Sequence, residues 1–167
     1  VSELNFETIR TISVGGEKLV PINPPKNYKL YNLYGPTEGT IYCSGFVVDK
    51  LYHRIPIGHA IKDYKFYVLD ENKHRLPYLV KGELYISGPQ VARGYLNRDE
   101  ENKKAFLTNP FDQDPRFRNL YKTGDIVRFL PNGEIDFIGR KDFQVKIRGF
   151  RVELSEVEQI IRQYPGS

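Results

Sequence analysis

One short stretch near the N-terminus gathers three side-chain types that could bind a nucleotide and its metal ion. It reads Asn32-Leu33-Tyr34-Gly35-Pro36-Thr37-Glu38. The ring of Tyr34 could stack on a base, and the hydroxyl of Thr37 could donate to a phosphate oxygen. Glu38 offers the hard carboxylate oxygen that Mg²⁺ prefers, with phosphates and water completing the coordination. The alternative interpretation of this stretch is an ordinary surface turn.

A second candidate pair, Asp125 and Arg140, depends on a predicted hairpin. Apolar and polar residues alternate on both sides of Pro131-Asn132-Gly133, which predicts a β-hairpin over Asp125–Ile138. Because its two strands meet at one end, the hairpin should bring Arg140 close to Asp125. The carboxylate oxygens of Asp125 match the spacing of two ribose hydroxyls, and Arg140 could reach the same sugar or a phosphate. A turn aspartate and a surface ion pair are the alternatives.

Short apolar runs separated by polar or Gly/Pro turns predict the β structure that would hold these residues. Strands are expected at 10–14 and 27–33, and the proline-rich stretch between them cannot form a long helix because proline lacks the backbone donor. Between residues 57 and 130 the pattern favours an antiparallel sheet or barrel. The apolar runs there are Phe66–Leu69, Leu84–Ile86 and Ile126–Leu130.

Further elements are expected in the second half of the chain. One helical segment lies around Glu100–Phe106, and period-two alternation over 143–147 indicates a half-buried strand. Ser155 and Glu158 form a capping-box signature, so a helix should begin at Ser155. Its apolar face would carry Val157, Ile160 and Ile161.

The composition allows one ordinary globular core and argues against two classes of partner. The chain has 167 residues, 40% of them hydrophobic. The net charge of +4 is scattered among 21 acidic residues, so no nucleic-acid partner is expected. No apolar run approaches the roughly 20 residues that a membrane-spanning helix needs, and no secretory leader is recognisable. We therefore expect no membrane association.

The cysteine and histidine residues suggest neither a disulfide nor a metal centre. Cys43 is the only cysteine, so packing must hold the fold, as suits a reducing, cytoplasmic compartment. A buried structural thiol is favoured over a nucleophile, because no histidine stands at a persuasive spacing. His53, His59 and His74 lie apart from any Cys or carboxylate cluster, so no zinc site is expected. Gly15-Gly16 lacks the spacing of a phosphate loop and is expected to bring backbone close to a ligand plane.

With these residues assembled, the chain resembles the amino-acid adenylation domains of nonribosomal peptide synthetases. These belong to the adenylate-forming superfamily, which includes acyl-CoA synthetases and luciferases. The resemblance covers almost the whole chain, and D-alanine-activating ligases are close relatives. It is carried by Asn32 through Glu38, Gly82 through Gly88, Val91 through Leu96, Tyr121 through Asp125 and Gly139 through Glu158.

The resemblance implies a mixed α/β fold in three parts. Residues 1–55 would be the C-terminal part of a large α/β subdomain, and 56–139 would form a β-barrel-like subdomain. Residues 140–167 would be the hinge and the start of a truncated small C-terminal α+β subdomain, the lid. Asp142 would be the hinge on which that lid swings.

The resemblance also implies a reaction and its cofactors, ATP and Mg²⁺. An amino-acid carboxylate would attack the α-phosphate to give an aminoacyl-AMP, and the aminoacyl group would pass to the phosphopantetheine thiol of a peptidyl carrier protein. Thr37, Glu38 and Lys146 would serve catalysis, Glu38 as metal ligand and Lys146 in the thioester-forming conformation. The nucleotide would be held by Gly15, Gly16, Glu17, Asn32, Tyr34, Asp125, Phe137 and Arg140. Phe137 departs from the tyrosine that is commoner in the family.

Five residues fall where the family lines its side-chain pocket, and they imply a largely apolar amino acid. They are Ile12, Val14, Leu33, Ile41 and Tyr42. The family's phosphate loop, its amine-binding aspartate and its adenylation lysine are not in this sequence, so the chain is expected to be a piece of an enzyme and inactive alone. The alternatives are a standalone acid–thiol ligase, of D-alanine-activating or acyl-CoA synthetase type, and a non-catalytic nucleotide-binding fragment.

Overall fold

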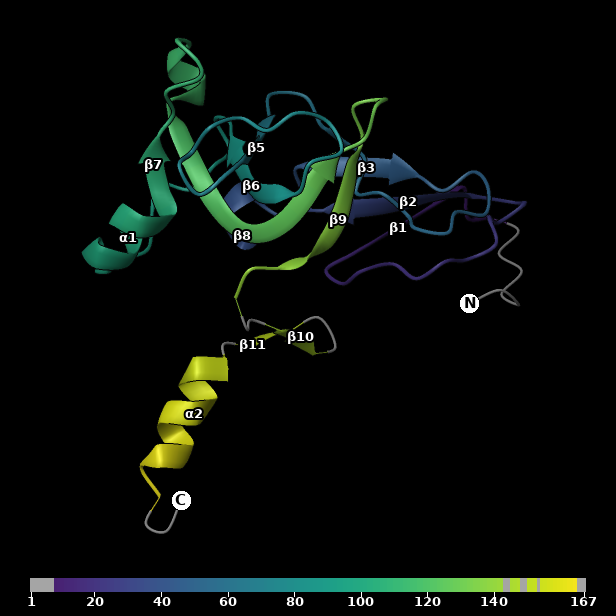
Figure 1. Ribbon diagram of the computed structural model, residues 1–167. Helices are drawn as coiled ribbons and strands as arrows, with labels where there is room; N and C mark the ends of the chain where they lie inside the picture. The colour runs from purple at the N-terminus through teal and green to yellow at the C-terminus, as the bar shows by residue number, and fades with distance from the viewer. Residues whose placement is uncertain (1–7, 143–144, 148–149, 153, 165–167) are drawn as a thin grey trace.

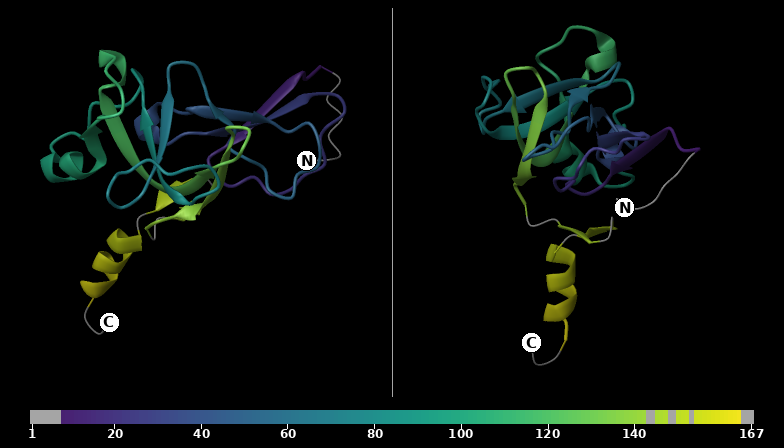
Figure 2. Two further views of the ribbon diagram at one scale, coloured as in Figure 1. Left: turned by 45° about the horizontal axis from the view of Figure 1, so that its top comes forward. Right: turned by 90° about the vertical axis from the view of Figure 1, so that its right-hand side faces the viewer.

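The computed structural model describes residues 8–142, 145–147, 150–152 and 154–164. Its strands and helices form a mixed α/β fold, which confirms the predicted fold class. Two β-sheets make up the main body, and the C-terminal helix α2 (Leu154–Arg162) projects away from it (Figure 1). Figure 2 shows the same projection from two further directions.

The first sheet contains the strands of the N-terminal third of the chain. Its order is β1 (Thr11–Gly15), β2 (Lys29–Tyr34), β3 (Ser44–Val47) and β4 (His59–Ala60). β1 and β2 pair in parallel, and the other pairs are antiparallel. The strands predicted at 10–14 and 27–33 are therefore confirmed, and the proline-rich connection between them contains no helix.

The second sheet is antiparallel and is built around one long strand. Its order is β5 (Lys65–Leu69), β6 (Gly82–Ser87), β8 (Asn119–Phe129) and β7 (Phe106–Thr108), and β9 (Ile135–Arg140) also pairs with β8. β8 curves strongly in Figure 1. The β8–β9 hairpin confirms the turn and the strands that were predicted around residues 131–133. The described strands form an open sheet and do not close into a barrel.

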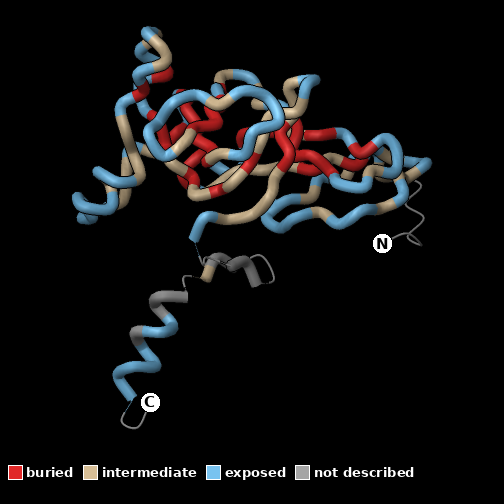
Figure 3. The backbone as a smooth tube through the Cα atoms, viewed as in Figure 1, coloured by how far each residue is buried: buried red, intermediate tan, exposed pale blue. Residues whose placement is uncertain are grey.

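Both faces of this second sheet are covered, as the alternation along β6 shows. Leu84 and Ile86 are completely buried in the main core, which also contains Cys43 and Val127. Tyr85, between them in sequence, points into a separate cluster with Leu120. The buried segments in Figure 3 accordingly gather in the two sheets. The predicted burial of Cys43 is confirmed.

The shorter elements lie at the edges of the sheets. α1 (Asp99–Ala105) confirms the helix expected around 100–106. The 3₁₀ helix η1 (Thr37–Gly39) follows β2, and η2 (Pro115–Phe117) precedes β8. β10 (Val145–Ile147) and β11 (Phe150–Val152) form a small antiparallel pair before α2. The residues predicted before β10, at 143 and 144, lie outside the described part of the chain.

Helix α2 exposes the apolar face that the sequence predicted for it. Val157, Ile160 and Ile161 are 42%, 60% and 53% exposed. The helix begins at Leu154, one residue before the predicted start. The capping side chain of Ser155 is not among the described side chains. Among the described residues, no helix has both the length and the apolar character to cross a membrane.

Gly58 joins the two sheets where no other residue fits. It bridges to Ile135 of β9, and Ile135 donates its backbone N–H to the Gly58 carbonyl at 2.9 Å. Its φ of +81° lies in the region that favours glycine, and an added Cβ would lie 1.9 Å from the carbonyl oxygen of Gly45. The junction of the sheets therefore depends on residue 58 being glycine, which has no Cβ.

We predict that Gly58→Ala lowers the free energy of unfolding by more than about 2 kcal/mol, because both backbone strain and a backbone clash must be relieved. Chemical denaturation would measure the change. Gly139→Ala on β9 is the control, since an added Cβ there meets nothing within 4 Å. Equal stability of the two variants would contradict the role given to Gly58.

Candidate functional site

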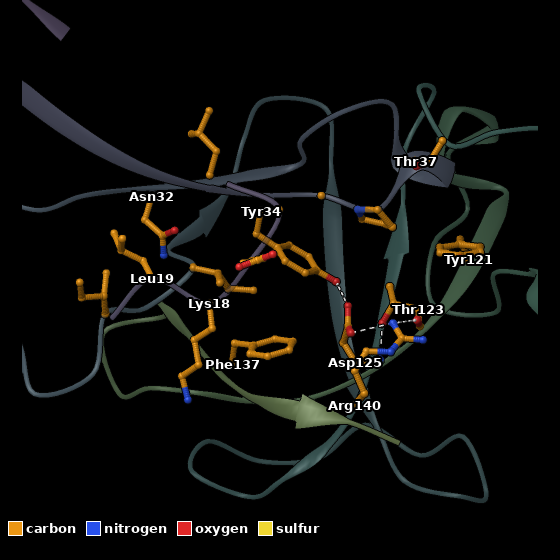
Figure 4. A pocket seen from close by; sticks show the side chains of 17 residues that line it. Lys18, Leu19, Asn32, Tyr34, Thr37, Tyr121, Thr123, Asp125, Phe137 and Arg140 are labelled. Carbon is orange, nitrogen blue, oxygen red and sulfur yellow. Dashed lines mark hydrogen bonds and ion pairs between the residues drawn. The ribbon is translucent and has the colours of Figure 1, made fainter. Parts of the chain in front are cut away.

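A cavity of about 570 Å³ lies where the two sheets meet, and most of the predicted nucleotide-binding residues line it. Its walls come from the loop after β1, the end of β2 with the following turn, and strands β8 and β9. The lining residues are Gly16, Glu17, Lys18, Leu19, Asn32, Leu33, Tyr34, Gly35, Pro36, Thr37, Ile55, Ile57, Tyr121, Thr123, Asp125, Phe137 and Arg140. Figure 4 shows how the labelled side chains converge.

A buried carboxylate, Asp125, is the centre of the polar wall. It is 5% exposed and receives hydrogen bonds from both sheets. The hydroxyl of Tyr34, at the end of β2, donates to Oδ2. Nη1 of Arg140, on β9, donates to Oδ1 at 2.8 Å. Asp125 and Arg140 are direct partners in the β8–β9 ladder, so the predicted juxtaposition is confirmed.

Arg140 in turn connects this carboxylate to Asp142. Its Nη1 also donates to the Thr123 carbonyl at 2.9 Å. Nε and Nη2 donate to the two carboxylate oxygens of Asp142 at 2.9 and 2.6 Å, a bidentate pair. Gly124 makes room for this arrangement, since an added Cβ would lie 2.8 Å from Nη2 of Arg140. The guanidinium therefore has its orientation fixed from three sides.

The electrostatics of the wall favour an uncharged tyrosine and a charged arginine. Burial raises the pKa of Tyr34 well above its usual value, and the neighbouring charge of Asp125 raises it further. For Arg140, burial lowers the pKa, but the hydrogen bonds and charges of Asp142 and Asp125 outweigh burial and raise it overall. Tyr34 therefore remains a hydrogen-bond donor to Asp125 at neutral pH.

Asn32 supplies the polar group at the other end of the cavity. Its side chain is 4% exposed, and Nδ2 donates to the Pro56 carbonyl at 2.8 Å. The amide is thereby oriented, and its carbonyl oxygen is the atom left to accept a hydrogen bond from a ligand. Figure 4 shows Phe137 and Tyr34 between Asn32 and Asp125, with their ring centroids 6.4 Å apart.

The two residues predicted to bind phosphate and metal differ in how far they are exposed to solvent. Thr37 is exposed and lines the cavity. Glu38, the next residue, is 5% exposed, lies behind the wall, and accepts a hydrogen bond at Oε1 from the hydroxyl of Tyr95 at 2.5 Å. The described residues contain no group of three or more His, Cys, Asp or Glu side chains that could hold a metal ion. A carboxylate is the ligand type that Mg²⁺ prefers, but Glu38 does not line the cavity in this structure.

Several predicted residues lie away from the cavity. Gly15 is on β1, where an added Cβ would lie 2.6 Å from the Leu33 carbonyl oxygen, so it is packed against β2. Among the five residues predicted for an amino-acid pocket, only Leu33 lines the cavity. Ile12 and Val14 pack against the cluster around Leu30 and Phe46.

The remaining two pocket residues lie on the surface. Ile41 is 78% exposed and Tyr42 is 44% exposed. Thr40 and Ile41 both have positive φ, 56° and 69°, although β-branched residues rarely adopt that conformation. The loop is held in place by Thr40, whose hydroxyl donates to the Gln90 carbonyl at 2.7 Å. The side chain of Lys146 is not among those the structure describes.

The sequence patterns assigned no binding role to three residues that shape this region. Tyr121 lines the cavity, and its hydroxyl interacts with Tyr95 and Glu38. Thr123 is buried within β8 and donates to the Leu84 carbonyl at 2.7 Å, which ties the stretch of β8 just before Asp125 to β6. Tyr121 and Thr123 belong to the same five-residue string as Asp125, which is the one signal that could have pointed to them. No such signal connected Tyr95 with Glu38.

Comparison with known proteins agrees with this geometry. A family model described as AMP-binding enzyme matches residues 3–96. Bacitracin synthase 1 of Bacillus licheniformis is 42% identical over 161 residues, covering 96% of this chain and 3% of that protein. Gramicidin S synthase 2 of Brevibacillus brevis is 42% identical over 167 residues, covering 96% of this chain and 4% of that protein.

Solved structures give the same picture of the fold. PA1221, a nonribosomal peptide synthetase protein containing adenylation and carrier (PCP) domains, superimposes with a TM-score of 0.81 at 32% identity, covering 94% of this chain and 33% of that one. The Vibrio cholerae adenylation domain AlmE, in complex with glycyl-adenosine-5′-phosphate, has a TM-score of 0.76 at 31% identity, covering 92% and 30%. The chain therefore spans a small part of the curated relatives and about a third of these solved chains.

The buried tyrosines predict a loss of stability in alkaline solution. The pKa is raised, first by burial, for Tyr34, Tyr64, Tyr85 and Tyr121, and for Tyr85 it reaches about 12. In the unfolded chain these hydroxyls ionise near pH 10. Their contribution to stability is therefore complete below about pH 10 and is lost as the pH rises through the folded-state values, at up to about 1.4 kcal/mol per pH unit for each group.

Urea denaturation at about pH 9 and about pH 11 would measure this loss. Tyrosinate absorbance provides an independent check, because the raised pKa values mean that these four hydroxyls should ionise at a higher pH in the folded protein than in the unfolded chain. A free energy of unfolding that stays constant over this range would contradict the burial described here.

Proposed function

The chain belongs to the family of AMP-binding enzymes, and from that premise we propose that it is part of an amino-acid adenylation domain of a nonribosomal peptide synthetase. The observation that carries the proposal is the order of groups along one cavity. An amide oxygen stands at one end, aromatic rings in the middle, and a buried carboxylate with its arginine at the other end. That order matches adenine followed by ribose and phosphate.

The base end of the cavity suits adenine. Nδ2 of Asn32 donates one hydrogen bond to the Pro56 carbonyl, which orients the amide, and its carbonyl oxygen can accept from the exocyclic amine of adenine. Guanine has a carbonyl oxygen at that position, which an acceptor would repel. Tyr34 and Phe137 supply apolar ring surface, and the backbone of Gly16 and Glu17 borders the same space.

The sugar end suits a ribose diol. A carboxylate oxygen can accept more than one hydrogen bond, and Asp125 lines the cavity, so it would accept from the sugar hydroxyls in addition to Tyr34 and Arg140. Arg140 also brings positive charge to this end. Thr37 lies farther along the wall, where it would meet a phosphate.

In the proposed reaction, a carboxylate oxygen of the amino acid attacks the α-phosphorus of ATP, and the bond to the β-phosphate oxygen breaks. The products are an aminoacyl-AMP and pyrophosphate. Mg²⁺, held near Glu38, would neutralise phosphate charge when bound. The described residues contribute mainly orientation, because phosphoryl-type transfers depend on alignment and charge stabilisation. A carrier-protein phosphopantetheine thiol then attacks the acyl carbon and releases AMP.

The partition of the chain follows from the same proposal. Residues 1–55 would belong to the large α/β subdomain, 56–139 to the β-rich subdomain, and 140–167 to the hinge and lid. Asp142, at the end of the described body, would be the pivot, and Lys146 would enter the site for thioester formation. We place the protein in the cytoplasm, where carrier proteins and amino acids would be available.

We also propose an apolar amino-acid substrate. Leu33 is the predicted pocket residue that reaches the cavity wall, and Ile12, Val14, Ile41 and Tyr42 supply apolar surface near β1 and the loop after β2. Activation of acidic or basic amino acids in preference to apolar ones would exclude this assignment.

We predict that Asp125→Asn raises the KM for ATP by about 10- to 100-fold, the expected cost of weakening hydrogen bonds to a charged group. Amino-acid-dependent ATP–pyrophosphate exchange by the full-length protein, run against a panel of amino acids, would measure it. Asp136→Asn is the matched control, because Asp136 is also a buried aspartate, paired with Arg128 at 2.9 Å, but does not line the cavity. Exchange that is equally affected by both variants would contradict the ribose contact.

We further predict that the 167 residues alone show negligible exchange, whereas the full-length protein is active. The chain covers about a third of the solved adenylation proteins, and stabilisation of developing charge requires groups from the rest of such a domain. Robust exchange by the isolated chain would overturn this expectation. No exchange by the folded full-length protein would overturn the proposed function itself.

A further inference from the structure

The hydroxyl of Tyr34 makes a contact that stacking on a base does not require. It donates to Oδ2 of Asp125, although 91 positions separate the two residues and they lie in different sheets. The base-binding role proposed for Tyr34 uses only the face of its ring, which a phenylalanine would offer equally well. The hydroxyl therefore has a role of its own in the cavity.

The Asp125 carboxylate is held through both of its oxygens. Tyr34 donates to Oδ2, and Nη1 of Arg140 donates to Oδ1 at 2.8 Å. The backbone N–H of Asp125 donates to Oγ1 of Thr123 at 3.0 Å, which orders the main chain at this point. One donor would leave the carboxylate free to turn about its Cβ–Cγ bond, whereas donors on both oxygens fix its plane. Asp125 therefore lines the cavity in a fixed orientation.

Tyr34 is itself held in place by the end of its strand and the turn that follows. It is the last residue of β2, and its carbonyl accepts the backbone N–H of Cys43 at 2.8 Å. The turn is tight, because an added Cβ on Gly35 would lie 2.3 Å from the Cα of Tyr42. Figure 4 shows the Tyr34 ring in the cavity with its hydroxyl directed at Asp125. The position of this donor is therefore set by the backbone around it.

The other aromatic side chains of the cavity do not make this contact. Three aromatic residues line the cavity, namely Tyr34, Tyr121 and Phe137. Phe137 has no hydroxyl, and the hydroxyl of Tyr121 interacts with Tyr95 and Glu38. Of these three residues, Tyr34 is therefore the one whose ring lies beside the base end and whose hydroxyl donates to the carboxylate at the sugar end.

We infer that Tyr34 is a positioning residue for the sugar of the nucleotide, because its hydroxyl orients the Asp125 carboxylate toward the two ribose hydroxyls. This inference rests on the proposed function and adds a second residue to its ribose contact. The two hydroxyls of a ribose stand at a fixed separation, so they bind best to a carboxylate whose plane is already set. Because the ring of the same residue borders the base, one side chain links recognition of the base with recognition of the sugar.

Tyr34→Phe tests this inference, because it removes the hydroxyl and keeps the ring. Calorimetric titration of the full-length protein with AMP and with 2′,3′-dideoxy-AMP measures binding without turnover. We expect Tyr34→Phe to raise the Kd for AMP by about 10-fold, close to the lower end of the cost of losing a hydrogen bond to a charged group. The Kd for dideoxy-AMP should change by less than about 2-fold, because that ligand has no hydroxyls from which Asp125 can accept.

The ratio of the two Kd values separates a positioning role from a structural one, since a loss of stability affects both ligands alike. Tyr64→Phe is the matched control. It removes a tyrosine hydroxyl that donates to the Gly39 carbonyl at 2.5 Å, and Tyr64 does not line the cavity, so both Kd values should match the wild type. In an Asp125→Asn background, Tyr34→Phe should not change the ratio further, because the group that it orients is already altered.

The possible failures can be told apart. A wild-type protein that binds neither ligand overturns the proposed function, and one that binds both equally overturns the ribose contact of Asp125. A wild type that prefers AMP, with a folded Tyr34→Phe variant of the same preference, overturns the inference alone. If Tyr34→Phe does not fold, 4-fluorophenylalanine at position 34 takes its place, since it fills the space of the hydroxyl without donating a hydrogen bond. With either substitution, a reduced preference for AMP supports the inference and an unchanged preference overturns it.

Discussion

A carboxylate that is removed from water must be compensated by donors, and much of the site is arranged to supply them to Asp125. One donor, Tyr34, comes from the first sheet and another, Arg140, from the second, so satisfying this charge also joins the sheets at the cavity. The same arginine holds Asp142, which links the body to the segment that leads toward α2. A single buried charge therefore unites the wall of the cavity, the sheet junction and the proposed pivot.

The parts of this arrangement that are local in sequence could be predicted. Asp125 and Arg140 face each other because an alternating pattern and a Pro-Asn-Gly turn define one hairpin, and hairpin pairing follows from turn position. The contact of Tyr34 with Asp125 spans 91 positions and two sheets. Neither periodicity nor turn chemistry specifies how two sheets pack, so this contact appeared only in the structure. The contact between Tyr95 and Glu38 was missed for the same reason.

The structure brings together most of the residues predicted to bind the nucleotide, but it does not bring together those predicted to bind the amino acid. Most residues assigned to the nucleotide share one cavity, because they lie on β2, β8 and β9 near a common edge. The residues assigned to the amino acid are dispersed between a packed strand, the cavity wall and an exposed loop. The family resemblance could identify the positions assigned to the amino acid. Their exposure, however, depends on tertiary neighbours, which sequence patterns do not encode.

The exposed loop at Thr40 and Ile41 has a consequence for how such a protein can change over generations. Ile41 and Tyr42 support little of the core, whereas the residues on the nucleotide side are buried and hydrogen-bonded across two sheets. Substitutions in the loop should therefore cost little stability, while substitutions around Asp125 should cost much. If the loop contacts the amino acid, as proposed, substrate choice can drift or be redesigned while the ATP-dependent chemistry stays intact. The residues that can change and the residues that must stay the same would then lie in neighbouring but separate parts of one small fold.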